Sequence, residues 1–270
     1  MRRIAPSTIV EPASVKAPAR HAPQYAMESL EHLPRPLAGL VSRAEALPLV
    51  ASLPQNNSEY AVAAAEAGAD AIMVGIDKTD ASLPGLFGSF DLMEDSIDAI
   101  LGSSTVPVGI SIGDSRPLIE ENWERIVAKP FSFVNMYAHH MPPFVLEDDR
   151  VEKLVSIGPG YMLEQVRRIS EMEGVCALEA AIVAAQGKTH IFSALDLATL
   201  GVLARLSAKP LLARTQKRMG PVDIRSVVRS GIRGVCVDAA SLEPGIEAYR
   251  HAITTFRSQV NPSGTPRKQP

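Results

Sequence analysis

The sequence has few cysteines, few aromatic residues and no long apolar run. Its only two cysteines, Cys176 and Cys236, each lie inside an apolar segment, which favours two buried thiols in a reducing compartment over a disulfide. No run of about 18 apolar residues occurs, so no membrane-spanning helix is expected. The net charge of -3 gives no reason to expect nucleic acid or an acidic membrane as a partner. These absences predict a cytoplasmic protein whose partner is a small molecule.

The length and composition predict one large globular domain. Apolar residues make up 46% of the 270 residues and charged residues 21%, which is ordinary for a chain with a sizeable core. Residues 1–27 and 261–270 are rich in proline and polar residues and are expected to be disordered tails around a domain at 28–260. Arg2 and Arg3, with no acid in the first ten residues, leave an organelle transit peptide as the alternative for the first tail. The oligomeric state stays open, a homo-oligomer included.

Residues 209–242 show the repeating unit of the fold most clearly. An apolar strand at 209–213 is followed by a polar loop, and Pro221 suits the first turn of a helix because the N–H that it lacks would be unpaired there. Val222, Ile224, Val227 and Val228 recur at helical spacing before the next apolar strand at 235–237. Two parallel strands joined by such a crossover form a βαβ unit.

The same unit recurs along the chain. Apolar segments that read as strands stand at 48–53, 72–76, 106–112, 131–138, 175–182, 209–213 and 235–237. They are continuously apolar, as in parallel sheets that helices cover on both faces. A (β/α)8 TIM barrel fits best, with the eighth strand at Leu37–Val41 or at residues 189–192. A doubly wound open sheet is the alternative, although no G-x-G-x-x-G follows any strand.

In a barrel of this kind, the active site lies where the strands end, and polar residues are concentrated there. The residues that we expect to bind substrate are Gln55, Asn56, Asp77, Lys78, Asn135, Arg214, Gln216 and Asp238, and those that we expect to be catalytic are Glu179, Lys217 and His139. Ser111, Asp114 and His140 occupy similar positions.

Glu179 is the most informative of these residues, because it interrupts the apolar segment 176–181. An unpaired carboxylate would cost several kcal/mol to bury there, so it needs a partner or a function. Arg214, at the end of a neighbouring strand, is the expected partner. The pair is either a structural ion pair or a general acid/base whose pKa is set by burial beside the cation.

The remaining polar residues each allow more than one interpretation. Lys217 and Lys78 either hold an anion, form a Schiff base with a carbonyl substrate, or are solvated surface lysines. His139 and His140 are adjacent, so only one can face the site, where it transfers a proton or makes a hydrogen bond at the rim. The carboxylates of Asp77, Asp114, Glu179 and Asp238 either bind Mg²⁺ or Mn²⁺ or cap helices, which leaves open whether a divalent metal is a cofactor.

The segments EAGADAIMVG, at 66–75, and KPLLARTQKRMGPVDIRSVVRSGIRGVCVDAASL, at 209–242, resemble those of the ribulose-phosphate-binding barrel superfamily and related aldolase-type barrels. The resemblance covers most of residues 48–242. It implies that backbone amides of glycine-rich loops after the last two strands grip a phosphate. The chain departs from that pattern, because Asp238 stands where the superfamily has a small residue and would repel an anion unless Arg214 or Lys217 neutralised it.

These observations predict a lyase or isomerase that acts on a small carboxylated or phosphorylated metabolite through an enol or enediolate. In this hypothesis Glu179 moves the proton and Arg214, Gln216 and Lys217 hold the anionic group, while Asn135, Gln55 and Asp77 orient hydroxyls. The alternatives are a divalent-metal-dependent aldolase and a non-catalytic barrel that binds a ligand or serves in assembly.

Overall fold

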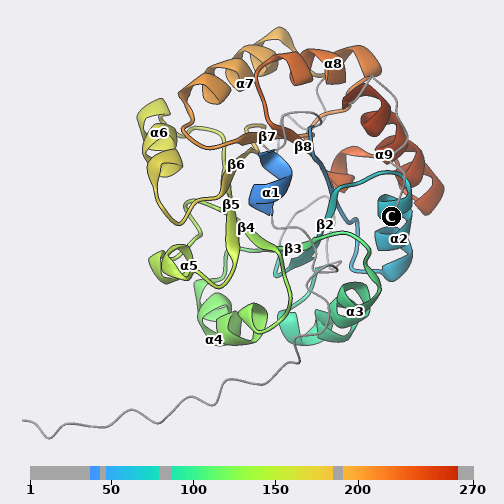
Figure 1. The fold of residues 1–270 in the computed structure, drawn as a ribbon, viewed down its shortest axis with the longest axis vertical. Helices are drawn as coiled ribbons and strands as arrows, with labels where there is room; N and C mark the ends of the chain where they lie inside the picture. Colours follow the sequence, from blue (N-terminus) through green and yellow to red (C-terminus); the bar gives the residue numbers. More distant parts are fainter. Residues whose placement is uncertain (1–36, 43–46, 79–86, 185–190, 261–270) are drawn as a thin grey trace, which may run out of the picture. The chain divides into compact units, whose positions relative to one another are not determined.

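The computed structural model describes residues 37–42, 47–78, 87–184 and 191–260, all of which belong to one compact unit, Pro34–Pro270. Both expected tails and residues 189–190 lie outside the described residues. In this unit, eight parallel strands form a closed barrel in sequence order, with β1 paired to both β2 and β8, and helices surround the ring (Figure 1). The structure therefore confirms the (β/α)8 TIM barrel.

The strands are short and almost entirely buried. They are β1 (Leu49–Ser52), β2 (Ala71–Ile76), β3 (Val108–Ile112), β4 (Phe133–Tyr137), β5 (Glu152–Ile157), β6 (Ala177–Ala180), β7 (Leu211–Arg214) and β8 (Gly234–Val237). The helices are α1 (Leu37–Val41), α2 (Ser58–Glu66), α3 (Phe90–Ser103), α4 (Arg116–Val127), α5 (Pro143–Glu147), α6 (Leu163–Glu171), α7 (Ala194–Leu206), α8 (Pro221–Arg229) and α9 (Ile246–Val260), with a short 3-10 helix, η3 (Ala239–Ser241).

The eighth strand is not where the sequence suggested. It is β5, Glu152–Ile157, which begins with two charged residues, whereas Leu37–Val41 forms α1. Lys153 is nonetheless buried, because its Nζ donates a hydrogen bond to the backbone carbonyl of Asp148. The strand was not predicted because its first two residues are charged and resemble the loop residues before them.

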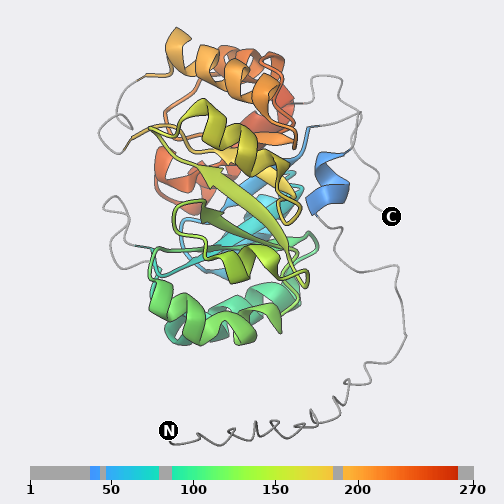
Figure 2. The same cartoon turned by 90° about the vertical axis from the view of Figure 1, so that its left-hand side faces the viewer.

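Helix α1 closes the N-terminal end of the barrel. Its buried side chains, Leu37, Leu40 and Val41, pack with side chains inside the ring of strands, and the helix lies at one end of the barrel (Figure 2). Its Ala38 N–H donates to Glu152 Oε2 at 3.0 Å, which ties the helix to the start of β5. The N-terminal end of the interior is therefore filled.

Interior positions of each strand alternate with positions that face the helices. The apolar cluster beside α1 contains Val50, Ala71, Met73, Phe133, Leu154, Ala177, Leu212 and Cys236, which we call the N-terminal layer. Gly109 makes room for Phe133, because a Cβ at Gly109 would collide with the phenyl ring. The larger apolar cluster lies between the strands and the surrounding helices. On α9, the Tyr249 hydroxyl donates a hydrogen bond to the Ser52 carbonyl of β1 at 3.0 Å.

Candidate active site

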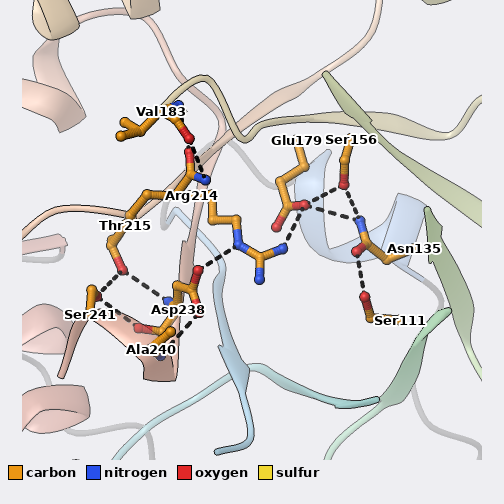
Figure 3. A network of polar contacts seen from close by, with 11 residues as sticks. Ser111, Asn135, Ser156, Glu179, Val183, Arg214, Thr215, Asp238, Ala240 and Ser241 are labelled. Atoms are coloured by element: carbon orange, nitrogen blue, oxygen red, sulfur yellow. Dashed lines mark hydrogen bonds and ion pairs between the residues drawn. The ribbon is translucent and has the colours of Figure 1, made fainter. Parts of the chain in front are cut away.

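Polar side chains replace apolar ones in the next interior layer, two residues further along the strands. Ser111 Oγ donates to Asn135 Oδ1 at 3.0 Å, and Asn135 Nδ2 donates to Ser156 Oγ at 2.8 Å and to Glu179 Oε2 at 3.1 Å. This chain of contacts crosses four neighbouring strands, β3 to β6, inside the barrel (Figure 3). The structure thus brings Asn135 and Glu179 together as the sequence led us to expect.

Glu179 is fully buried, at 0% exposure, and its two oxygens differ. Oε2 accepts hydrogen bonds from Ser156 at 2.5 Å and Asn135, and lies 3.4 Å from Arg214 Nη1. Oε1 has no hydrogen-bond partner in the part of the chain that the structure describes. A buried carboxylate oxygen without a partner is costly, so this atom marks a place where a ligand would be stabilised.

Arg214 lies between two carboxylates. Its Nε donates to Asp238 Oδ2 at 2.9 Å on one side, and its Nη1 faces Glu179 on the other. Burial alone would lower the pKa of Arg214, but the charges of Asp238 and Glu179 outweigh burial and raise the pKa well above its ordinary value. The second terminal nitrogen, Nη2, carries no contact to the other side chains drawn in Figure 3. The expected pairing of Glu179 with Arg214 is confirmed.

Asp238 also organises the chain that follows β8. Its Oδ1 accepts the Ala240 N–H at 3.1 Å at the start of η3, and its own N–H donates to Thr215 Oγ1 at 2.9 Å. Ser241 Oγ donates to the Asp238 carbonyl at 2.7 Å. The Asp238 carboxylate therefore links Arg214 to the first turn of a short helix.

Two side-chain amides are fixed to the backbone of neighbouring strand ends. Asn56 Nδ2 donates to the Gly75 carbonyl at 2.7 Å, and Gly75 N–H donates to Asn56 Oδ1 at 3.0 Å. Gln216 makes the same pair of bonds with Val183, at 2.9 and 3.3 Å. We call these two pairs the amide clamps. Their donors and acceptors are engaged in shaping the rim, so they offer less to a substrate than the sequence suggested.

Lys217 is paired within the protein. Its Nζ donates to Asp196 Oδ2 at 2.7 Å, and Asp196 also forms a capping box with Ser193 at the start of α7. Burial alone would raise the pKa of Asp196, but the hydrogen bonds from Lys217 and Ser193 outweigh it and lower that pKa. Asp196 was not among the residues that we predicted for the site from the sequence.

His139 lies at the rim above the polar layer. Its backbone N–H donates to the Tyr161 hydroxyl at 3.2 Å, and its Nδ1 contacts the same hydroxyl. Burial and then the neighbouring His140 lower the pKa of His139. Tyr137 packs against both imidazole rings, with centroids 5.4 and 6.0 Å apart, and is close enough to Arg214 to affect its pKa. Tyr137 therefore lies next to His139 and also near Arg214 of the buried pair.

The other predicted residues lie at the exits of β1 to β3. Asp77 has a φ of 52°, in the left-handed region, and its carbonyl packs where a Cβ at Gly113 would collide. Burial and then Asp91 raise the pKa of the Asp77 carboxyl, which places it toward the start of α3. Lys78 Nζ lies 4.9 Å from the centroid of the Phe87 ring, and Gln55 is half-buried.

A metal site is not assembled from the acids that the sequence singled out. Within residues 37–42, 47–78, 87–184 and 191–260, no group of three or more His, Cys, Asp or Glu side chains is placed to hold a metal ion. Glu179 and Asp238 instead share Arg214.

No described helix is long and apolar enough to cross a membrane.

Sequence reasoning did not assign three residues that lie next to the predicted site residues. Ser156 orients Glu179 and stands on the unrecognised strand β5, where alternation in Leu154, Ser156 and Gly158 was the available signal. Tyr161 holds His139. Cys236 lies below the buried pair, where burial and then the charge of Glu179 raise the pKa of its thiol. Both cysteines are free.

Two cavities differ in their relation to this layer. One, of about 10 Å³, is lined by Arg214, Gln216, Lys217 and Asp196 together with apolar side chains of the β6 exit and α7. That volume is roughly the room needed by one water molecule. The other, of about 490 Å³, is an open groove between α7 and α8 and contains none of the predicted site residues. The cavity beside Arg214 is therefore too small for a metabolite while its lining side chains keep these positions.

Comparison with known proteins supports the fold. No protein-family model and no curated protein sequence matches the chain. Among solved structures, tryptophan synthase from M. tuberculosis is similar with a TM-score of 0.60 and 14% identity over 80% of this chain and 93% of that chain. A phosphoribosylantranilate isomerase from Thermotoga maritima has a TM-score of 0.56 and 14% identity over 80% of this chain and 99% of that chain. The YdjI aldolase from Escherichia coli K12 has a TM-score of 0.53 and 13% identity over 83% and 92%. At these identities the similarity shows the shared fold, and the chain is a TIM-barrel protein whose structural neighbours include proteins of aldolase and isomerase type.

Proposed function

We propose that this protein is a lyase or isomerase that moves a proton on a small oxygen-rich metabolite through an enol or enediolate. The observation that supports this proposal is the buried carboxylate of Glu179, whose Oε2 lies 3.4 Å from Arg214 Nη1 and whose Oε1 has no hydrogen-bond partner among the described residues. One atom can accept a proton, and the guanidinium can donate a hydrogen bond. Both lie at the C-terminal ends of the strands, where TIM-barrel enzymes have their active sites.

The proposed step uses only groups of the chain. Glu179 Oε1 removes the proton from a carbon beside a carbonyl group. The electron pair of that C–H bond forms a carbon–carbon double bond, and the π pair of the carbonyl moves to its oxygen. Arg214 Nη2 donates a hydrogen bond to that oxygen as negative charge develops on it. In an isomerase reaction, Glu179 returns the proton to the former carbonyl carbon while the hydroxyl proton of the enediolate moves to the oxygen beside Arg214, which leaves the carbonyl on the neighbouring carbon. In a lyase reaction, Glu179 instead removes the proton of a hydroxyl group on the β carbon. That carbon becomes a carbonyl, the bond between the α and β carbons breaks, its electron pair forms the enolate whose oxygen Arg214 binds, and Glu179 then returns the proton to the α carbon.

The surroundings of Glu179 hold it in one orientation. Ser156, Asn135 and Arg214 all contact Oε2, so the carboxylate cannot rotate without losing these bonds. Asn135 is in turn fixed by Ser111 and by the Leu154 carbonyl, at 3.0 Å each. A reactive group whose supporting contacts are complete loses little free energy to reorganisation during the reaction.

The competing proposal is a barrel that binds a ligand without catalysis or serves in assembly. Complete burial of Glu179 and the small cavity above Arg214 favour it, because both limit access of a substrate to the carboxylate. In that case Glu179 and Arg214 would orient a bound ligand and nothing more. A divalent-metal-dependent aldolase is a third proposal, and the described acids offer it no group of three ligands.

The test is hydrogen–deuterium exchange at the carbon beside the carbonyl of hydroxyacetone, dihydroxyacetone and glyceraldehyde, followed by NMR in deuterated water. We expect Glu179→Gln, which keeps the shape of the side chain, to slow exchange by about 10²- to 10⁴-fold. Glu152→Gln is the matched control, since Glu152 lies at the opposite end of the barrel beside α1. Exchange that survives Glu179→Gln would remove the proposed base. Binding without exchange in the wild type would support the non-catalytic barrel.

A further inference from the structure

The places where a barrel of this type would hold an anion are occupied by carboxylates of the chain itself. After β7, the Gly220 N–H at the start of α8 donates to Asp223 Oδ2 at 2.9 Å. After β8, the Ala240 N–H at the start of η3 donates to Asp238 Oδ1 at 3.1 Å. Backbone N–H groups at helix starts are common partners of phosphate, and at each of these two helix starts one such N–H is satisfied by a neighbouring aspartate.

The cationic side chains of the same region are also neutralised. Arg214 is held by Glu179 and Asp238 together, with N···O distances of 3.4 and 2.9 Å. Lys217 is held by Asp196 at 2.7 Å, and both of these side chains are largely buried. Two carboxylates share one guanidinium, so an anionic group that approached Arg214 would meet the negative charge of Asp238 and Glu179 at close range and in a medium that screens little.

We infer that the substrate is an uncharged hydroxy-carbonyl compound, without the phosphate or carboxylate that the sequence led us to expect. The inference rests on the function proposed above, because it concerns the same pair of groups. Glu179 Oε1, which has no hydrogen-bond partner among the described residues, can accept a C–H or O–H hydrogen. Arg214 Nη2, which has no dashed contact to the other residues drawn in Figure 3, can donate a hydrogen bond to a carbonyl oxygen. Asn135 and Ser156, which are neutral, line the same layer. A small polyhydroxylated aldehyde or ketone supplies these groups without bringing a negative charge.

The first test compares matched compounds. Exchange is measured for glyceraldehyde against glyceraldehyde 3-phosphate, and for dihydroxyacetone against dihydroxyacetone phosphate, at equal concentration. We expect the uncharged member of each pair to exchange faster, by on the order of tenfold to a hundredfold. Faster exchange of the phosphorylated members would overturn the inference and leave the proposed proton transfer intact.

The second test does not depend on activity. Isothermal calorimetry with inorganic phosphate should show no saturable binding to the wild type in the millimolar range, whereas Asp238→Asn should gain it, because one negative charge beside Arg214 is removed. Asp95→Asn, a substitution of the same charge at an exposed position on α3, should gain none. Saturable phosphate binding by the wild type that disappears in Arg214→Gln would contradict the inference, and so would an Asp238→Asn variant that still fails to bind. Absence of exchange with every compound would reject the proposed function and leave this second result to decide the charge preference of the site.

Discussion

The two layers of the barrel interior are built on the same strands and have opposite chemistry. On β4, β6 and β7 the N-terminal layer contributes Phe133, Ala177 and Leu212, and two residues later the same strands contribute Asn135, Glu179 and Arg214. The first layer is apolar and is covered by α1. The second is a connected polar network that includes a carboxylate oxygen without a hydrogen-bond partner among the residues that the structure describes. Successive interior positions of a strand are two residues apart, so one such step leads from the apolar layer to the polar layer.

The two layers differ in what they contribute to the stability of the fold. Apolar side chains in the N-terminal layer contribute by leaving water, whereas a buried ion pair has to offset the cost of removing charges from water before it contributes anything. Polar groups are therefore retained in the second layer at a stability cost, which is what a binding or reacting site requires. Substitutions in the N-terminal layer should change stability alone, whereas substitutions in the polar layer should also change activity.

The largest effect is expected where the second layer loses its cation. Arg214→Met keeps the length of the side chain but leaves Glu179 and Asp238 without their shared partner, and we expect it to lower the free energy of unfolding by about 3–5 kcal/mol. Urea denaturation at neutral pH measures this loss. Adding Glu179→Gln to that variant should recover part of the stability, because one buried charge then disappears. A loss below about 1 kcal/mol for Arg214→Met would show that the network is hydrated and not buried.

A slightly smaller effect is expected in the N-terminal layer, without a change in chemistry. Leu40 on α1 is 4% exposed and packs inside the barrel, so Leu40→Ala should lower the free energy of unfolding by about 2–4 kcal/mol. The rate of hydrogen–deuterium exchange on the substrate, per folded molecule, should stay unchanged, since α1 lies at the end of the barrel opposite the polar layer. Leu92→Ala is the control, because Leu92 is 74% exposed and should lose less than about 0.5 kcal/mol. Exchange that falls with Leu40→Ala would show that the two layers are coupled.

The smallest effect concerns a polar cluster outside the strands, near the start of β5. Hydrogen bonds from Arg150 are the main cause that holds the pKa of Asp148 well below its ordinary value of 3.8, despite burial, and Trp123 Nε1 donates to the same carboxylate at 2.8 Å. Asp148→Asn should therefore lower the free energy of unfolding by about 1–2 kcal/mol at pH 7.

The difference in free energy of unfolding between wild type and Asp148→Asn should depend on pH. A carboxyl whose pKa is lowered in the folded state stabilises the fold above its unfolded pKa, and this contribution is lost as the pH falls toward the folded pKa. The gap between wild type and Asp148→Asn should accordingly shrink as the pH drops below about 4. Fluorescence of Trp123, the only tryptophan, follows unfolding in both proteins. Glu147→Gln, at an exposed neighbouring position, should show no such pH-dependent gap.

The sequence was sufficient for the barrel and for the centre of the site. Continuously apolar strands with polar exits predicted the parallel closed sheet, and an acid within an apolar strand predicted the contact between Glu179 and Arg214. The strand β5 was missed because Glu152 and Lys153 look like loop residues, although Lys153 reaches a backbone carbonyl while buried. Local sequence does not reveal which polar partner a charged strand residue will find across the fold.

The partners of the remaining polar residues could not be predicted for a related reason. Lys217 and Gln216 both follow β7, yet one is held by Asp196 on α7 and the other by the Val183 backbone. Those contacts depend on how far each strand end projects from the ring, which only closure of the barrel determines. The expectation of a gripped phosphate came from the resemblance, whereas the structure shows the carboxylates of Asp223 and Asp238 accepting backbone N–H groups after β7 and β8.

The amide clamps have a practical consequence for protein engineering. Asn56 holds the backbone of Gly75 and Gln216 holds that of Val183, each through two hydrogen bonds that need nothing from the segments that come next. The ends of β2 and β6 are thus anchored before the chain leaves the ring. Replacement segments grafted after these two anchors would inherit fixed starting points, so this rim is suited to transplanting loops from other barrels while Glu179 and Arg214 stay in register.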